Sequence, residues 1–110
     1  MPVPVREKLR AIRDDLGSQA RVARALGVSP SRVSRWLKTE DPDPENRRKV
    51  EALEFVLAYL VSFLHPDVAV DWLNGHNAFL RNFRPIDYLA RGRIEQVIQA
   101  ARAFKAGSFH

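Results

Sequence analysis

Five polar or basic side chains recur after Pro30 at a spacing that a helix would bring to one face. Arginine can bind a guanine edge through two hydrogen bonds, and serine can contact bases or phosphates. A helix with such a face is suited to the major groove of DNA. The residues expected to contact DNA are Gln19, Ser29, Ser31, Arg32, Ser34, Arg35 and Lys38, with Arg13, Arg21 and Arg24 adding attraction to the phosphate backbone.

Residue types that could support catalysis or metal binding are present, but their spacing does not favour either. None of the three histidines, His65, His76 and His110, forms an i, i+4 pair of the kind that holds zinc on a helix. Asp67 and Asp71 are four residues apart, but acids near a helix start are common for electrostatic reasons. The serines have no general base close in sequence, and no glycine-rich phosphate loop is present. We therefore expect no catalytic residue, no metal site and no cofactor.

The elements that would present the DNA-contacting face form a helix-turn-helix over residues 19–37. Ala23 supplies the small residue where the two helices touch, and Gly27 stands four residues later at the turn. Apolar residues that would pin both helices to a core follow at the required spacings: Val22, Leu26, Val28, Val33 and Trp36. The motif resembles the helix-turn-helix of phage-repressor-like and Xre-like regulators. The alternative is a motif that only packs or dimerises, but its outward face is basic rather than apolar.

The whole chain is predicted to be all-α, since periodic apolar residues indicate helices and no segment alternates like a strand. The expected organisation is a DNA-binding domain over residues 1–40 and a second helical domain, expected to dimerise, over residues 44–110. In the second domain a long helix, 44–65, is followed by a region, 66–110, that contains shorter helices. Serine or aspartate followed by proline marks two helix starts, and the segment TEDPDPEN separates the halves.

Charge and composition favour an anionic partner and a reducing compartment. The net charge is +5, with residues 1–40 at +5, residues 41–80 at −4 and residues 81–110 at +4. The absence of cysteine excludes disulfides and cysteine-ligated zinc. The N-terminus has no apolar signal core, and the longest apolar run, residues 55–61, is too short to cross a bilayer. We expect a cytoplasmic protein that has no membrane partner.

A second ordered pattern occupies residues 72–97. Its residues are Trp72, Leu73, Asn77, Leu80, Pro85, Ile86, Asp87, Leu89, Gly92 and Val97. This order resembles the toxin-binding domain of Xre/MbcA/ParS-like antitoxins, a family that couples it to an N-terminal helix-turn-helix. The chain departs from the family pattern in having one extra residue between Leu89 and Gly92, Arg81–Asn82 where a glycine is frequent, and Arg84 where a Thr or Ser cap is frequent.

The resemblance implies an antitoxin encoded beside a RES-domain toxin, an enzyme that degrades NAD. The domain of residues 44–110 would then bind the toxin as well as dimerise, with a toxin-binding motif over residues 66–110 covering the entrance to the toxin's active site. The complex would repress its own operon. Arginine and aromatic side chains dominate the energetics of protein interfaces. The residues expected to contact the toxin are Arg91, Arg93, Arg102, Phe104, Lys105, Ser108, Phe109 and His110. Core packing is an equally good interpretation of Phe104, and the better one for Trp72.

Three hypotheses about function remain open from the sequence. The first is an antitoxin that binds a RES-domain toxin and operator DNA, as a homodimer or as a hetero-oligomer with the toxin. The second is a stand-alone repressor whose C-terminal half only dimerises, since helix-turn-helix proteins usually bind two half-sites as two-fold dimers. The third is an interaction protein whose helix-turn-helix no longer binds DNA.

Overall fold

The computed structural model describes residues 4–107, and the expected all-α fold is confirmed. No β-strand occurs in this part of the chain, where Asn77 and Phe83 form an isolated β-bridge. The helices are α1 (Val5–Leu16), α2 (Gln19–Leu26), α3 (Pro30–Lys38), α4 (Pro44–Leu60), α5 (Pro66–Asn74), the 3-10 helix η1 (Ala78–Leu80), α6 (Pro85–Ala90) and α7 (Ile94–Gly107). Within residues 4–107, no helix is both long and apolar enough to span a membrane.

Local sequence signals explain the helix-turn-helix geometry. Gly17 and Gly27 follow α1 and α2 with φ of 96° and 69°, a left-handed conformation that glycine adopts without a steric penalty. The Ser18 hydroxyl accepts a hydrogen bond from the Arg21 N–H at 3.2 Å, and the Ser29 hydroxyl accepts one from the Arg32 N–H at 3.3 Å. These caps satisfy backbone donors that each helix start would otherwise leave unpaired. The two turns therefore set where α2 and α3 begin.

The long helix α4 is shorter than its sequence pattern predicts. We expect it to reach His65, but it ends at Leu60, and the 44–65 boundary is wrong at its C-terminal end. After Leu60 the backbone turns tighter, with the Ser62 N–H bonded to the Tyr59 carbonyl at 3.2 Å. The Ser62 hydroxyl donates to the same carbonyl at 2.6 Å, which gives this backbone an alternative to helical pairing. Pro66 further disfavours helical geometry at the residue before it.

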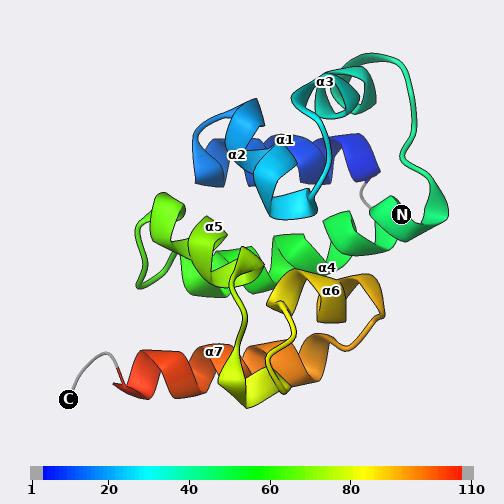
Figure 1. The fold of residues 1–110 in the computed structure, drawn as a ribbon. Helices are drawn as coiled ribbons and strands as arrows, with labels where there is room; N and C mark the ends of the chain where they lie inside the picture. The colour runs from blue at the N-terminus through cyan, green and yellow to red at the C-terminus, as the bar shows by residue number, and fades with distance from the viewer. Residues whose placement is uncertain (1–3, 108–110) are drawn as a thin grey trace.

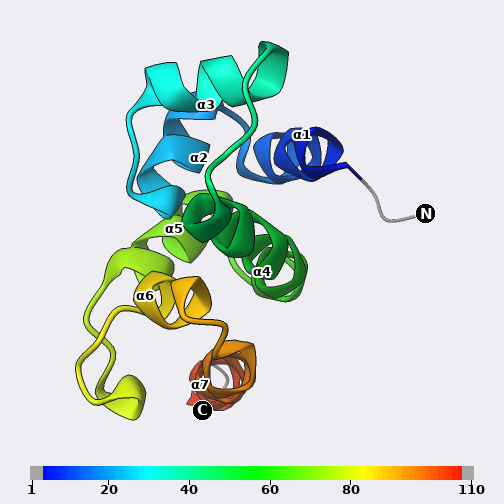
Figure 2. The same ribbon diagram turned by 90° about the vertical axis from the view of Figure 1, so that its right-hand side faces the viewer.

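The helices pack in layers around one continuous apolar core. Figure 1 shows α1, α2 and α3 above α4 and α5, with α6 and α7 below. Figure 2 shows α3 and α7 at opposite ends of the molecule. The molecule measures 45 × 29 × 25 Å along its principal axes. The largest fully buried side chains are Leu9, Ile12, Leu16, Val22, Leu26, Val33, Leu53, Leu57, Leu60, Leu73, Ile86 and Leu89. Residues from both predicted domains share this core, so α3 and α7 are positioned by one body of packed side chains.

Candidate functional site

Helix α3 presents the polar face that its spacing predicts. Its apolar side is buried, with Val33 and Trp36 packed into the core. On the outer side, Ser31, Arg35 and Lys38 are exposed, and Arg32 and Ser34 are half-buried. At the edges of this face, Gln19 is half-buried at the first residue of α2 and Ser29 is exposed at the start of α3. The candidate DNA-contacting residues of α3 therefore lie together on its outer face, which we call the α3 face.

The two arginines of the α3 face have carboxylate partners in the segment that follows the helix. The Arg32 guanidinium lies 5.1 Å from the Trp36 ring centroid, and its Nη2 is 3.2 Å from Asp43 Oδ1. Arg35 Nε is 3.2 Å from Glu40 Oε2. A hydrogen bond from the Asn46 side chain, with smaller help from the Arg32 charge, holds the pKa of Asp43 below its usual value. Asp43 is therefore a charged partner of Arg32 at neutral pH.

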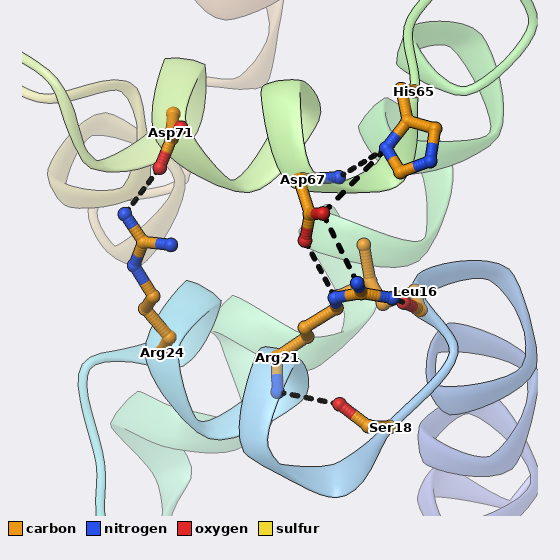
Figure 3. Close-up of polar contacts among 7 residues, drawn as sticks. All are labelled: Leu16, Ser18, Arg21, Arg24, His65, Asp67 and Asp71. Carbon is orange, nitrogen blue, oxygen red and sulfur yellow. Dashed lines mark hydrogen bonds and ion pairs between the residues drawn. The ribbon is translucent and has the colours of Figure 1, made fainter.

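Arg21 and Arg24 point to α5 rather than toward a DNA surface (Figure 3). Arg21 binds Asp67 through two nitrogens, at 2.6 and 3.1 Å, and donates a third hydrogen bond to the Leu16 carbonyl at 2.8 Å. Arg24 pairs with Asp71 one turn further along the same two helices. The expectation that these arginines attract the DNA backbone does not fit this geometry, because α2 carries them on its side toward α5. Their role in the structure is to tie the helix-turn-helix to α5.

This arrangement predicts measurable coupling between Arg21 and Asp67. Bidentate geometry favours the pair, but both side chains are more than one-third exposed, so solvent screening weakens it. In a double-mutant cycle of Arg21→Ala and Asp67→Ala, the coupling free energy should be about 0.5–1 kcal/mol, measured by urea unfolding. If the free-energy changes of the two single variants simply add up to that of the double variant, the ion pair does not contribute to stability.

The same contacts account for the acids that could have bound a metal. Asp67 and Asp71 are occupied by arginines, and His65 Nδ1 accepts a hydrogen bond from the Asp67 N–H at 3.3 Å as the cap of α5. Within residues 4–107, no three His, Asp or Glu side chains gather closely enough to hold a metal ion. His110 lies outside the described residues.

At the other end of the molecule, aromatic and arginine side chains form a second exposed surface. Phe79 and Phe83 are 58% and 47% exposed, which is unusual for large apolar side chains. The Arg91 guanidinium lies 5.9 Å from the Phe83 ring, and Arg93 lies 5.9 Å from the Tyr88 ring. A shallow pocket continues this surface between η1 and α7, and Arg81 is on its wall. We call Phe79, Arg81, Phe83, Arg91 and Arg93 the aromatic–arginine patch.

The residues predicted to contact a toxin divide between this patch and other places. Arg91 and Arg93 belong to the patch, whereas Arg102 lines a groove between α4 and α7. Phe104 contacts Trp72 with ring centroids 6.2 Å apart, but its side chain is exposed rather than part of the core. Lys105 Nζ lies 5.7 Å from the Tyr59 ring and 5.4 Å from the Phe63 ring. Ser108, Phe109 and His110 lie outside the described residues.

Three members of the patch were not among the sequence-based candidates: Phe79, Arg81 and Phe83. They lie in and around a turn in which Arg81 and Asn82 have φ of 57° and 65°. The Asn82 conformation fits the tolerance of asparagine for left-handed backbone, but the same conformation at Arg81 is uncommon for a long side chain. The sequence contains one indication of their exposure: neither phenylalanine belongs to a helical pattern of apolar residues that would bury it.

The ordered pattern of residues 72–97 mainly builds the scaffold behind the patch. Leu73, Leu80 and Leu89 are buried, and the Asn77 side chain accepts a hydrogen bond from the Phe79 N–H at 3.0 Å. Arg84, which replaces a capping residue, makes no cap. Its guanidinium instead binds the Asp87 carboxylate at 2.9 and 3.0 Å, which lowers the pKa of Asp87.

Comparisons with known proteins agree with this architecture. No family model matches the chain. A "probable mycobacterial cidal antitoxin" of Mycobacterium tuberculosis (strain ATCC 25618 / H37Rv) is 34% identical over 92 residues, which cover 84% of this chain and 79% of that protein. The crystal structure of the M. tuberculosis MbcT–MbcA toxin–antitoxin complex contains a chain of the same fold, with a TM-score of 0.67 and 23% identity, covering 96% of this chain and 97% of that one. The chain therefore belongs to the family of mycobacterial cidal antitoxins.

Proposed function

We propose that this antitoxin binds and inhibits a RES-domain, NAD-degrading toxin, and represses its own operon through the α3 face. The observation that supports the proposal is that two exposed surfaces of different chemistry belong to helices at opposite ends of one packed body: the α3 face, and the aromatic–arginine patch around η1 and α6 (Figures 1 and 2). The α3 face is polar and basic, as a DNA-reading helix requires. The aromatic–arginine patch has the composition of an interface hot spot.

The toxin would be bound through the aromatic–arginine patch. Arg81, Arg91 and Arg93 are exposed and form no ion pair within residues 4–107, so an acidic partner could engage all three. The exposed rings of Phe79 and Phe83 would supply apolar area that is buried on binding. An acidic rim with an apolar centre is thus the chemistry expected of the toxin surface. The predicted contacts of Arg102, Phe104 and Lys105 would be secondary, since two of these side chains already pack within the antitoxin.

Operator DNA would be bound by the α3 face, with Arg32 and Arg35 at base edges and serine side chains at bases or phosphates. Gln19 and Ser29 would contact the phosphates that flank the groove. A single helix-turn-helix contacts few base pairs, so a dimer or a toxin-linked assembly would provide the second half-site. The functional division into residues 1–40 and residues 44–110 follows from this assignment.

A stand-alone dimeric repressor is the second candidate, and the groove between α4 and α7 favours it. Phe55 is 63% exposed there, beside the partly buried Ile94 and Ile98. Charged side chains at its edges, Glu54, Glu95 and Arg102, could pair between two copies related by a two-fold axis. Under this alternative the aromatic–arginine patch would have no partner.

Co-expression with the open reading frame beside its gene tests the proposal. The antitoxin should co-elute with the neighbouring protein on size exclusion and stop its NAD consumption, and the complex should shift a duplex from the operon's promoter. An isolated dimer that shifts the duplex but binds no neighbour would favour the stand-alone repressor. A toxin complex that shifts no promoter fragment would favour the interaction protein without DNA binding.

A further inference from the structure

The segment between α3 and α4 places carboxylates directly on the arginines of the α3 face. Asp43 lies 3.2 Å from Arg32, and Glu40 lies 3.2 Å from Arg35. The four side chains are 42% to 56% exposed, so these pairs add little to the stability of the fold. Both arginines proposed to contact DNA are therefore held by acids from one short segment, residues 40–43.

The backbone keeps this acidic segment close to α3. Pro42 and Pro44 restrict its conformations, and Figure 2 shows it descending from the end of α3 to the start of α4. A third acid, Asp41, lies 3.8 Å from Arg6, whose Nε donates a hydrogen bond to the Trp36 carbonyl at 3.0 Å. All three carboxylates of the segment thus meet arginines on or beside α3.

We propose that the acidic segment 40–43 is an internal competitor of DNA that lowers the affinity of the α3 face for any duplex. A guanidinium donates its N–H groups to a carboxylate or to a phosphate, so Asp43 and Glu40 compete with DNA for Arg32 and Arg35. The displaced carboxylates then remain near the phosphates and repel them. The competition would lower the affinity most for duplexes that bind only through their phosphates. A duplex that also makes base contacts would be bound in preference to them. The inference rests on the proposed DNA binding.

The test is the double variant Glu40→Gln/Asp43→Asn, measured against a promoter duplex by fluorescence anisotropy. Asparagine caps helices as well as aspartate does, so α4 should start unchanged. The matched control is Glu7→Gln/Glu51→Gln, which changes the net charge equally at two exposed acids that form no ion pair within residues 4–107. At low salt the first variant should bind about fivefold tighter than the wild type, and the control less than twofold tighter. The gain should shrink as salt rises.

Two outcomes would overturn the inference while leaving DNA binding intact. The first is an equal gain in affinity for both variants, which would show that only net charge matters. The second is no gain in affinity for Glu40→Gln/Asp43→Asn. If no protein shifts the duplex, the proposed DNA binding itself fails. The salt concentration at which each protein elutes from heparin, a polyanion without bases, then tests the competition between the acidic segment and phosphate-like anions. The Glu40→Gln/Asp43→Asn variant should elute at higher salt than the control, and co-elution of the two would reject the competitor.

Discussion

Replacing Arg32 and Arg35 together by alanine should weaken binding to the operator duplex by about thirtyfold or more. Each arginine in a base-reading position is worth roughly 1–3 kcal/mol, and both lie on the α3 face. The fold should survive, because each side chain loses only an exposed ion pair and, for Arg32, a cation–π contact with Trp36. Anisotropy with the promoter duplex measures the affinity, and circular dichroism checks the melting temperature.

Variants of base-contacting and phosphate-contacting residues should differ in their effect on sequence preference. Gln19→Ala should weaken all duplexes by a similar, smaller factor, since phosphate contacts carry no sequence information. The Arg32→Ala/Arg35→Ala protein should instead lose its preference for the promoter duplex over a scrambled one. Wild-type affinity and preference in that protein would remove α3 as the recognition helix.

Replacing Arg91 and Arg93 by alanine should weaken inhibition of the toxin by about thirtyfold to a thousandfold. Arginines in an interface contribute roughly 1–2 kcal/mol each, and these two lie beside aromatic rings. Neither arginine forms an ion pair within residues 4–107, so stability should fall by less than about 1 kcal/mol per residue. The measurement is the antitoxin concentration that halves NAD consumption by the toxin.

The two arginine pairs serve as controls for each other, because each variant removes two positive charges. Arg91→Ala/Arg93→Ala should bind the promoter duplex normally, and Arg32→Ala/Arg35→Ala should inhibit the toxin normally. Phe83→Ala should reproduce part of the Arg91→Ala/Arg93→Ala loss without any change of charge. Full inhibition by both patch variants would move toxin binding to Arg102 or to the tail, residues 108–110.

Local chemistry allowed most of the fold to be predicted from the sequence. Ser29–Pro30 and Asp43–Pro44 mark helix starts that the structure has at the same residues, since a cap followed by proline depends only on neighbouring backbone. The end of α4 was predicted too late, because apolar spacing continues to Leu64 while the backbone already turns. The 3-10 helix η1 was missed because three residues are too few for a periodic signal.

The candidate surfaces could be predicted from the sequence only where they depend on local helical spacing, and not where they depend on tertiary packing. The α3 face follows from helical periodicity, and its side chains lie where the spacing places them. The partners of Arg21 and Arg24 did not follow, because Asp67 and Asp71 are brought to them by tertiary packing across more than forty residues. The expectation that the chain is not an enzyme agrees with its membership of an antitoxin family, whose members act by binding.

If the antitoxin binds a toxin and an operator at opposite ends of the same body, both partners should bind at once. Native mass spectrometry of the antitoxin, the RES-domain toxin and the promoter duplex, mixed together, tests it most directly. We expect an assembly that contains all three components, with NAD consumption still inhibited. Displacement of the duplex by the toxin, or of the toxin by the duplex, would contradict two separate surfaces.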